Sequence, residues 1–577
     1  MRKSRELAQL ILIPALVFAV VFVGHLLFYK IVSQNSSPIW WRLYVLTQTY
    51  LISFSLALAF AFGAYALIMA KGRSSKAVAG SAGIALLVWF TSACGAPLIV
   101  VGLGLIGVSF GAEALPPWVT TLLTLVFISF GVYWLHRKGA DTCGATCYAT
   151  TTGEHADLYK GIGVNMEKFG TQQCIAGDLY KRTFTTQQNR PAAMSYFDDM
   201  VADIYGPRIR EIMAAKKQGK IVVGNFCVFV PEELILAIGG ISVGLCAGSQ
   251  APIADAEKVL PRNICPLVKS AYGYALTKSS PYFQVVDFVC GETTCDAKKK
   301  TWELMDREIS TYVMEIPQMK REKDRSLWLD EIKDFKSKLE SLSKKTITAE
   351  SLAKAIEIMD RKRAALQRLN SLRYHRPTPI SGRDALLVEQ IAFYDDPVRF
   401  SEKVNILCGE LENRMRDGIF AAPVKAPRVM ISGSPMALPN WKIHNLVEGA
   451  GAVVVNEESC VGTRYFSDQV ASVASDPDLQ LAALTKRYMK INCACFTPNQ
   501  DRIEQIIREC RASHADGIIH YSLQFCHPYI IEAVRVREAC VREGIPFLGI
   551  ESDYSTEDTG QLQTRIEAFL EQIGGGK

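Results

Sequence analysis

The chain has long apolar runs near its amino terminus and a mixed apolar and polar pattern over the rest. Four runs contain no charged side chain, and each is long enough to cross a bilayer. They are residues 7–29, 43–70, 77–112 and 114–135. Because charged residues occur only between these runs, we predict an all-α transmembrane bundle of four helices in residues 1–140. Four buried core helices are the alternative interpretation.

Basic residues around these runs predict their orientation. Eight Lys and Arg side chains fall on the side that holds the amino terminus, and Lys30 and Arg42 fall on the other. Cytoplasmic flanks of membrane helices carry the excess of Lys and Arg. We therefore expect a multi-pass protein of the inner (cytoplasmic) membrane, with its amino terminus and its large carboxy-terminal part in the cytoplasm.

The pattern from residue 191 onward changes to short β-branched runs separated by segments with helical spacing. Strands are predicted at 220–227, 241–246, 452–456, 517–521 and 545–550, and another begins at Arg428. Strands that alternate with helices indicate parallel α/β layers. The stretch 296–375 is rich in Lys, Glu, Asp and Leu and poor in Gly, which predicts long helices with solvated faces.

The predicted fold class is therefore α/β, with two Rossmann-like parallel-sheet lobes and linking helices, preceded by the transmembrane bundle. A polar juxtamembrane connector separates the bundle from the lobes. The expected boundaries are 1–140 for the membrane region, 141–190 for the connector, 191–300 for lobe 1, 301–426 for the helical linking region and 427–577 for lobe 2.

The charge is distributed unevenly over these parts. The whole chain carries +6, but residues 1–140 hold ten Lys and Arg against two Asp and Glu, so the remainder is slightly acidic at −2. A nucleic-acid partner is therefore not expected. We find neither a P-loop pattern nor a Gly-rich dinucleotide loop after a strand, so ATP or dinucleotide binding through those loops is not expected either.

Sixteen cysteines are the main candidates for chemistry. Several lie just past predicted strands or in loops of the two lobes, where parallel α/β layers bind ligands. Thiolates gathered there could hold an iron–sulfur cluster. Zinc is disfavoured because the chain lacks tight CxxC knuckles, and disulfides are disfavoured on the cytoplasmic side. Buried free thiols are the remaining alternative. The set consists of Cys227, Cys265, Cys295, Cys460, Cys495 and Cys526.

The segments around these cysteines resemble the 2-hydroxyacyl-CoA dehydratase family. They read FCVFVPEELILA (226–237), LPRNICPLVKS (260–270), TCDAKKK (294–300), ESCVGTRYF (458–466), SLQFC (522–526) and GIPFLGIESDYS (544–555). The resemblance covers about residues 190–573, in order, and leaves out the apolar amino-terminal part. That part departs from the soluble members of the family.

The resemblance implies a two-lobed protein with a cubane [4Fe-4S] cluster between its lobes. It also implies electrons from a separate ATP-hydrolysing iron–sulfur activator. In the dehydratases the electron forms a ketyl radical of the acyl-CoA substrate, and water leaves. Cys265, Cys295 and Cys526 match the cubane ligands of that family. Cys227, Cys460 and Cys495 resemble the additional ligands of the double-cubane [8Fe-9S] branch, whose members reduce small molecules.

Some assignments stay open at this level. Cys493 could replace Cys495 as a ligand. Lys269, Ser270, Gln524 and His527 flank the ligands and could tune a cluster through hydrogen bonds, or could serve only in capping and packing. Cys246, Cys290, Cys510 and Cys540 are interpreted as structural.

We therefore expect a membrane-anchored iron–sulfur reductase of the double-cubane type, acting on a small molecule and forming a homodimer. An (R)-2-hydroxyacyl-CoA dehydratase subunit is the first alternative. The second is a membrane transporter of a soft metal with a metal-binding cytoplasmic part, suggested by Cys94, Cys143 and Cys147. The segment around Cys94 is faintly similar to the first helix of MerT-like mercuric ion transporters, but lacks their second cysteine.

Overall fold

A computed structural model describes residues 15–23, 57, 154–187, 189–202, 206–470 and 475–574. Within these ranges, no helix is both long enough and apolar enough to span a bilayer. The four predicted spans meet the described residues only in the helical stretch 15–23 and at Ala57. The membrane bundle, its orientation, Cys94 and the pair Cys143 and Cys147 thus lie outside the described residues and stay predictions.

The chain divides into two compact units, 1–143 and 144–577, and the second contains two four-stranded sheets. All strand pairs in both sheets are parallel. The sheet of lobe 1 has the order β2-β1-β3-β4, and that of lobe 2 has the order β6-β5-β7-β8. The strands are β1 (Val222–Asn225), β2 (Ile241–Gly244), β3 (Phe288–Glu292), β4 (Thr311–Met314), β5 (Arg428–Gly433), β6 (Val453–Glu458), β7 (Gly517–Leu523) and β8 (Phe547–Ser552). The prediction of two parallel-sheet lobes is confirmed.

Two strands of lobe 1 were not predicted. β3 is a short segment that contains a glycine, and β4 is a four-residue edge strand inside the predicted helical region 301–426. Pairing of Val289 with Thr311 adds β4 to the sheet. Neither segment has a long enough apolar pattern to predict a strand. Their extended form therefore depends on the neighbouring strand, which supplies the hydrogen bonds.

The helices that precede and accompany the sheet of lobe 1 begin within the predicted connector. Two of them, α7 and α8, occupy the part of 141–190 that the structure describes. Their buried aromatic side chains Tyr159, Phe169 and Phe184 join the main hydrophobic core. The connector therefore packs against the lobes. The helices are α7 (Glu154–Gly161), α8 (Met166–Phe184), α9 (Met194–Ala202), α10 (Pro207–Lys217), α11 (Glu232–Ala237), α12 (Ile253–Ala256), α13 (Pro266–Thr277), α14 (Pro281–Val285) and α15 (Asp296–Met305).

Four helices follow β4, and the first two are the long helices that the composition of 296–375 predicts. They are α16 (Glu322–Ser343), α17 (Ala349–Arg373), α18 (Gly382–Ile391) and α19 (Pro397–Arg416). Thr348 caps α17 by accepting a 3.1 Å hydrogen bond from the Ser351 amide. Buried ion pairs join α17 to both lobes, Arg363 with Glu233 of α11 and Arg373 with Glu457 of β6. This helix therefore helps to hold the lobes in a defined relation.

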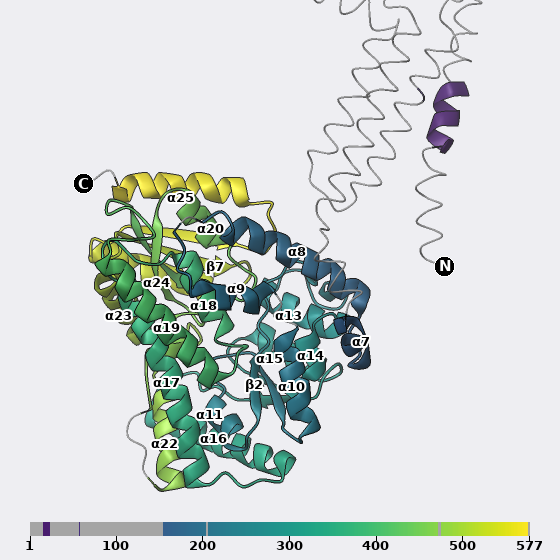
Figure 1. The fold of residues 1–577 in the computed structure, drawn as a ribbon, viewed down its shortest axis with the longest axis vertical. Coiled ribbons are helices and arrows are strands. Elements are labelled where there is room, and N and C mark those ends of the chain that lie inside the picture. The colour runs from purple at the N-terminus through teal and green to yellow at the C-terminus, as the bar shows by residue number, and fades with distance from the viewer. Residues whose placement is uncertain are drawn as a thin grey trace, which may run out of the picture. The chain divides into compact units, whose positions relative to one another are not determined.

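Lobe 2 completes the chain and shares a core with lobe 1. Its helices are α20 (Lys442–Gly449), α21 (Thr463–Phe466), α22 (Pro477–Tyr488), α23 (Gln500–Ala512), α24 (His527–Arg542) and α25 (Thr559–Gly574). One hydrophobic cluster runs through both lobes and the linking helices. Figure 1 shows α25 on the outer side of lobe 2, with α16, α17 and α22 side by side at the other end of this unit.

Candidate functional site

The loops that follow the strands of both sheets line one cavity of about 590 Å³. Lobe 1 contributes residues directly after β1 and β3, and lobe 2 contributes residues directly after β6 and β7. In parallel α/β sheets, ligands bind at these carboxyl ends of the strands. The cavity therefore lies where the topology of both lobes predicts a ligand.

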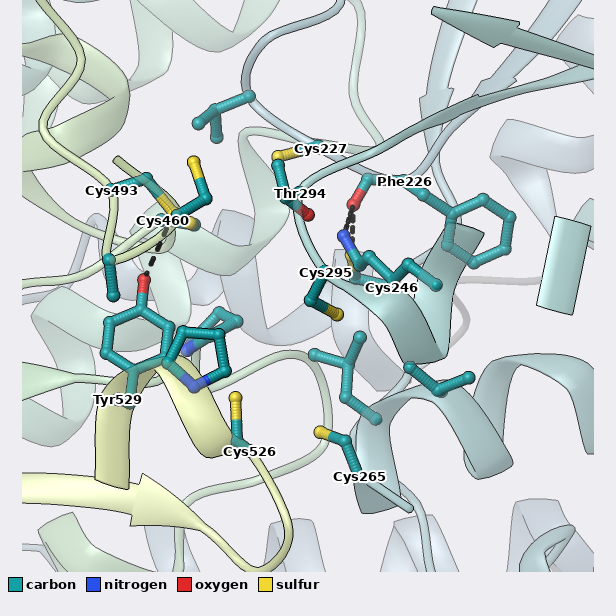
Figure 2. A pocket seen from close by; sticks show the side chains of 18 of the residues that line it. Phe226, Cys227, Cys246, Cys265, Thr294, Cys295, Cys460, Cys493, Cys526 and Tyr529 are labelled. Atoms are coloured by element: carbon teal, nitrogen blue, oxygen red, sulfur yellow. Dashed lines mark hydrogen bonds between the residues drawn. The ribbon is translucent and has the colours of Figure 1, made fainter. Parts of the chain in front are cut away.

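Eight cysteines line this cavity, and they come from both lobes. Figure 2 shows labelled sulfur atoms on several sides of one open space. All six predicted ligands are present, together with Cys493 and Cys246. The set is Cys227, Cys246, Cys265, Cys295, Cys460, Cys493, Cys495 and Cys526.

Three of these cysteines stand at the amino ends of helices. Cys265, Cys295 and Cys526 are the N-cap residues of α13, α15 and α24. The amino end of a helix carries a partial positive charge, which favours an anionic thiolate or an anionic ligand bound to it. These are the three residues that the family resemblance assigns to a cubane.

Cys460 and the Cys493–Cys495 segment lie in loops of lobe 2 that tertiary contacts hold. After Cys460 the chain turns sharply at Gly462, where a Cβ atom would lie 2.1 Å from the Glu457 carbonyl oxygen. The Cys493 carbonyl accepts a 2.9 Å hydrogen bond from the Asn499 amide group. The Thr497 amide donates to the Gln318 carbonyl of lobe 1, also at 2.9 Å. The two loops are thus held by specific contacts.

Six of the thiols interact electrostatically in three pairs, and two of the pairs join the lobes. The pairs are Cys227 with Cys460, Cys265 with Cys526, and Cys493 with Cys495. The interaction within each pair lowers the pKa of Cys460, Cys265 and Cys493 and raises the pKa of the other thiol. The pKa of Cys493 falls to about 5, because the Cys495 thiol and the nearby Arg464 cation outweigh the effect of burial. Each pair therefore favours ionisation of one of its two thiols.

A buried ion pair in lobe 1 supplies positive charge next to the thiols. Lys298, in the first turns of α15, pairs with the fully buried Glu292 at the end of β3. Its ammonium also donates to the Phe226 carbonyl at 3.4 Å. Burial opposes its charge, but Glu292 and the thiols of Cys227 and Cys246 hold the pKa of Lys298 well above its usual value. Lys298 is therefore a fixed cation in the wall of the cavity.

A second buried group of charges lies behind the lobe 2 thiols. Arg464 donates from Nε to Glu458 at 2.7 Å and from Nη1 to the sulfur of Cys460 at 3.5 Å. Arg502 donates to the same Glu458 at 2.8 Å. Both guanidinium groups lie 5.2 Å from the centre of the Tyr529 ring, and the Tyr529 hydroxyl is 3.6 Å from the Cys493 sulfur. Positive charge and hydrogen-bond donors thus approach the sulfurs from lobe 2.

Of the four flanking residues that we considered, only His527 lines the cavity. Lys269 binds Glu257 at 2.8 Å and the Arg262 carbonyl at 3.0 Å, and Ser270 donates to the Ser249 carbonyl at 2.7 Å. Gln524 pairs through its backbone with Ser552. These contacts of Lys269 and Ser270 hold the segment after Cys265 in place.

The cysteines interpreted as structural have different positions. Cys290 is buried inside β3, and Cys510 and Cys540 belong to a small separate core between α23, α24 and the sheet of lobe 2. Cys246 lines the cavity, and its thiol donates to the Phe226 carbonyl at 2.8 Å. Cys246 lies two residues after β2. The parallel pairing of β2 with β1 brings Cys246 to the same edge of the sheet as Cys227.

Sequence reasoning missed Lys298, Arg464 and Tyr529 as site residues. Lys298 lies three residues after Cys295, and Tyr529 lies three residues after Cys526, each within the helix that the cysteine caps. Arg464 lies four residues after Cys460. A basic or hydroxyl-bearing side chain one helical turn beyond a predicted ligand is the signal that could have identified them. Phe525 was missed as well; it lines the cavity with a left-handed φ of 60°, unusual for a bulky side chain.

The donor set fits a polynuclear cluster. No three His, Cys, Asp or Glu side chains among the described residues meet closely enough to hold a single metal ion. Thiolates are the donors that iron–sulfur clusters use. Eight cysteine thiols line a cavity with room for a group larger than one ion, and the buried cations Lys298 and Arg464 lie next to them.

Comparisons with known proteins cover the same part of the chain. The model of the family described as 2-hydroxyglutaryl-CoA dehydratase, D-component, matches residues 227–573. YjiM of Escherichia coli strain K12, by name a candidate dehydratase subunit, is 34% identical over 365 residues, 63% of this chain and 94% of YjiM. The beta subunit of (R)-phenyllactyl-CoA dehydratase from Clostridium sporogenes is 24% identical over 383 residues, 66% of this chain and 98% of that protein. One of the subunits of benzoyl-CoA reductase from Thauera aromatica is 23% identical over 356 residues, 59% of this chain and 87% of that protein.

Proposed function

Because the chain belongs to the 2-hydroxyglutaryl-CoA dehydratase D-component family, we propose that it is an iron–sulfur enzyme of the double-cubane type. It is an enzyme of the dehydratase and reductase type, as its relatives are. The proposed reaction is the low-potential reduction of a small molecule, with electrons from a separate ATP-hydrolysing activator. The observation that carries the double-cubane assignment is the number of thiols. A single [4Fe-4S] cluster takes four cysteines, and eight line this cavity.

The residues of both lobes would share the cluster. Cys265, Cys295 and Cys526 would hold one part of it at three helix amino ends. Cys227, Cys460 and either Cys493 or Cys495 would hold the other part. A bound cluster of this kind supplies one-electron chemistry at low potential.

The rest of the cavity suits an anionic group that must be kept from water. Aromatic side chains, including Phe226, Phe393 and Phe496, form much of its apolar wall. Lys298 and Arg464 place positive charge next to the sulfurs. Negative charge inside a low-dielectric site needs such partners, because burial without them is costly.

Metal and sulfide analysis of anaerobically purified protein tests this proposal. We expect iron and acid-labile sulfide together with an electron paramagnetic resonance signal on reduction. Protein without labile sulfide would refute it. Single alanine variants of Cys227, Cys460, Cys493 and Cys495 then separate the cluster types, with Cys510→Ala as a buried-thiol control. A double cubane requires that Cys227→Ala and Cys460→Ala lose iron while Cys510→Ala does not, and unchanged iron in both would leave a single cubane.

An (R)-2-hydroxyacyl-CoA dehydratase subunit is the second candidate function. It is supported by relatives whose names specify acyl-CoA dehydratases, including the beta subunit of (R)-2-hydroxyglutaryl-CoA dehydratase from Acidaminococcus fermentans. Incubation of the reduced protein with (R)-2-hydroxyacyl-CoA thioesters distinguishes the two functions. Formation of the enoyl-CoA product would favour dehydration. The mass of the complex in solution would show whether the chain acts as the homodimer that we propose or needs a different subunit.

The amino-terminal region is proposed to anchor this enzyme in the cytoplasmic membrane. The support is its four uncharged runs and the basic residues that flank them. Fractionation of cells that express the full chain tests the anchor, since an integral protein stays with membranes after alkaline carbonate washing. The soft-metal transporter interpretation predicts metal uptake that Cys94→Ser abolishes; uptake unchanged by Cys94→Ser would refute it.

A further inference from the structure

Two side chains of lobe 2 link a buried group of charges to two cavity sulfurs. Arg464 Nη1 donates both to the Cys460 sulfur, at 3.5 Å, and to the Tyr529 hydroxyl. The Tyr529 oxygen in turn lies 3.6 Å from the Cys493 sulfur, a contact drawn in Figure 2. Because an arginine can only donate, the Tyr529 oxygen accepts from it, and the hydroxyl proton is left for Cys493.

The position of Arg464 is determined by contacts on its far side. Its side chain is fully buried. Nη2 donates to the Gly433 carbonyl at 2.8 Å and to the Glu458 carbonyl at 2.9 Å, and Nε binds the Glu458 carboxylate. The Glu458 carboxylate therefore lies on the side of the guanidinium away from the cavity, and Nη1 points to the Cys460 sulfur and the Tyr529 hydroxyl. The geometry is held by the end of β5 and the end of β6, two rigid elements of the sheet.

We propose that Arg464 and Tyr529 are positioning residues that raise the reduction potential of a cluster bound by Cys460 and Cys493. The inference rests on the proposed function, because it requires the cluster. Reduction adds one negative charge, and hydrogen-bond donors at the sulfurs stabilise the reduced state more than the oxidised state. Arg464 acts on Cys460 directly and on Cys493 through Tyr529.

Matched variants separate this role from a general effect on the buried core. Tyr529→Phe removes one hydroxyl, and Arg464→Lys keeps the charge but cannot reproduce all of the N–H contacts. Arg502→Lys is the control for arginine, because Arg502 is equally buried, pairs with the same Glu458 and lies at the same distance from the Tyr529 ring. Its donors go to oxygens of Ser432, Glu458 and Glu532. Tyr488→Phe is the control for tyrosine, since its buried hydroxyl binds Glu233 outside the cavity.

The test is a redox titration of the anaerobically purified full chain, followed by electron paramagnetic resonance, with iron content measured on the same samples. We expect Tyr529→Phe and Arg464→Lys to keep their iron and to shift the midpoint potential to more negative values. An approximately tenfold fall in the equilibrium constant for one-electron reduction corresponds to about 59 mV. The midpoint potentials of Arg502→Lys and Tyr488→Phe should match that of the wild type.

The outcomes distinguish this inference from the function on which it rests. Unchanged midpoint potentials in Tyr529→Phe and Arg464→Lys, at full iron content, would overturn the inference and leave the proposed function standing. An equal shift in Arg502→Lys would overturn it too, because the effect would then belong to the buried charges in general. Wild-type protein without iron and sulfide would overturn both. If Arg464→Lys does not fold, Tyr529→Phe alone decides the question.

Discussion

The side-chain amide of Asn499 donates a 2.9 Å hydrogen bond to the backbone carbonyl of Cys493. The same amide group binds Glu532 of α24 at 2.6 Å. Asn499 therefore ties the loop that carries Cys493 and Cys495 to the helix that begins at Cys526. This buried side chain therefore links two segments that carry cavity thiols.

We predict that Asn499→Ala loosens this loop. The Cys493 carbonyl would keep only its 3.3 Å hydrogen bond from the Phe496 amide, and the loss of one such hydrogen bond typically costs about 0.5–1.5 kcal/mol. We expect a fall of that size in the free energy of unfolding and faster loss of iron to a chelator. Asn445→Ala is the control, because Asn445 donates to Thr183 at 2.8 Å on the α20 side of the fold. Equal rates of iron loss in the two variants would contradict the prediction.

The ion pair between Lys298 and Glu292 leads to a prediction about stability. Lys298→Met would leave the fully buried Glu292 carboxylate with Thr294 as its remaining hydrogen-bond donor. Breaking one side of a buried pair costs about 3–5 kcal/mol. Guanidinium unfolding should show this loss in Lys298→Met and a recovery of most of it in the double variant Lys298→Met/Glu292→Gln. A double variant as unstable as the single one would show that the lost charge pair is not the cause.

The raised pKa of Glu509 leads us to predict that the free energy of unfolding depends on pH. This half-buried residue of α23 faces β6, and desolvation of its carboxyl group raises its pKa to about 7, although Asn456, Thr463 and Gln505 donate hydrogen bonds to it. Between about pH 4.5 and 7 the folded state holds a proton that the unfolded state has lost. The contribution of this group is therefore complete at low pH and is lost as the pH rises through 7.

The matching experiment compares the wild type with Glu509→Gln, which imitates the neutral carboxyl group. The difference in unfolding free energy should grow in favour of the variant as the pH rises from 5 to 7, by about 2 kcal/mol. Because the two proteins share all other titrating groups, the contributions of those groups to the unfolding free energy cancel in this difference. A constant difference over this range would show that Glu509 ionises normally in the folded protein.

Gly462 provides a test of the turn after Cys460. Gly462→Ala would place a Cβ atom 2.1 Å from the Glu457 carbonyl oxygen, so the turn that carries Cys460 and Arg464 must move. Strain of this kind costs about 1–3 kcal/mol. We expect reduced iron content and lower stability. Gly449→Ala, at the end of α20 with open space around its Cα, should change neither by a comparable amount.

Much of the fold was predictable because its signals are local. Segments such as Val222–Asn225 and Gly517–Leu523 are short apolar runs bounded by turn residues, and they form strands as predicted. The long helices α16 and α17 follow from composition and spacing. The weak segments β3 and β4 were missed, because a neighbouring strand rather than their own sequence makes them extended.

Local sequence patterns establish which segments can form strands and helices and which cysteine-containing motifs the chain carries. Which thiols meet depends on how the two lobes pack. Cys265 and Cys526, on different lobes and far apart in the chain, line the same cavity only because both sheets direct their carboxyl ends toward it. The tertiary structure also placed Lys298, Arg464 and Tyr529 against the sulfurs. Local propensity acts over a few residues, whereas these contacts depend on packing two complete lobes around a shared core, a long-range effect that no single segment encodes.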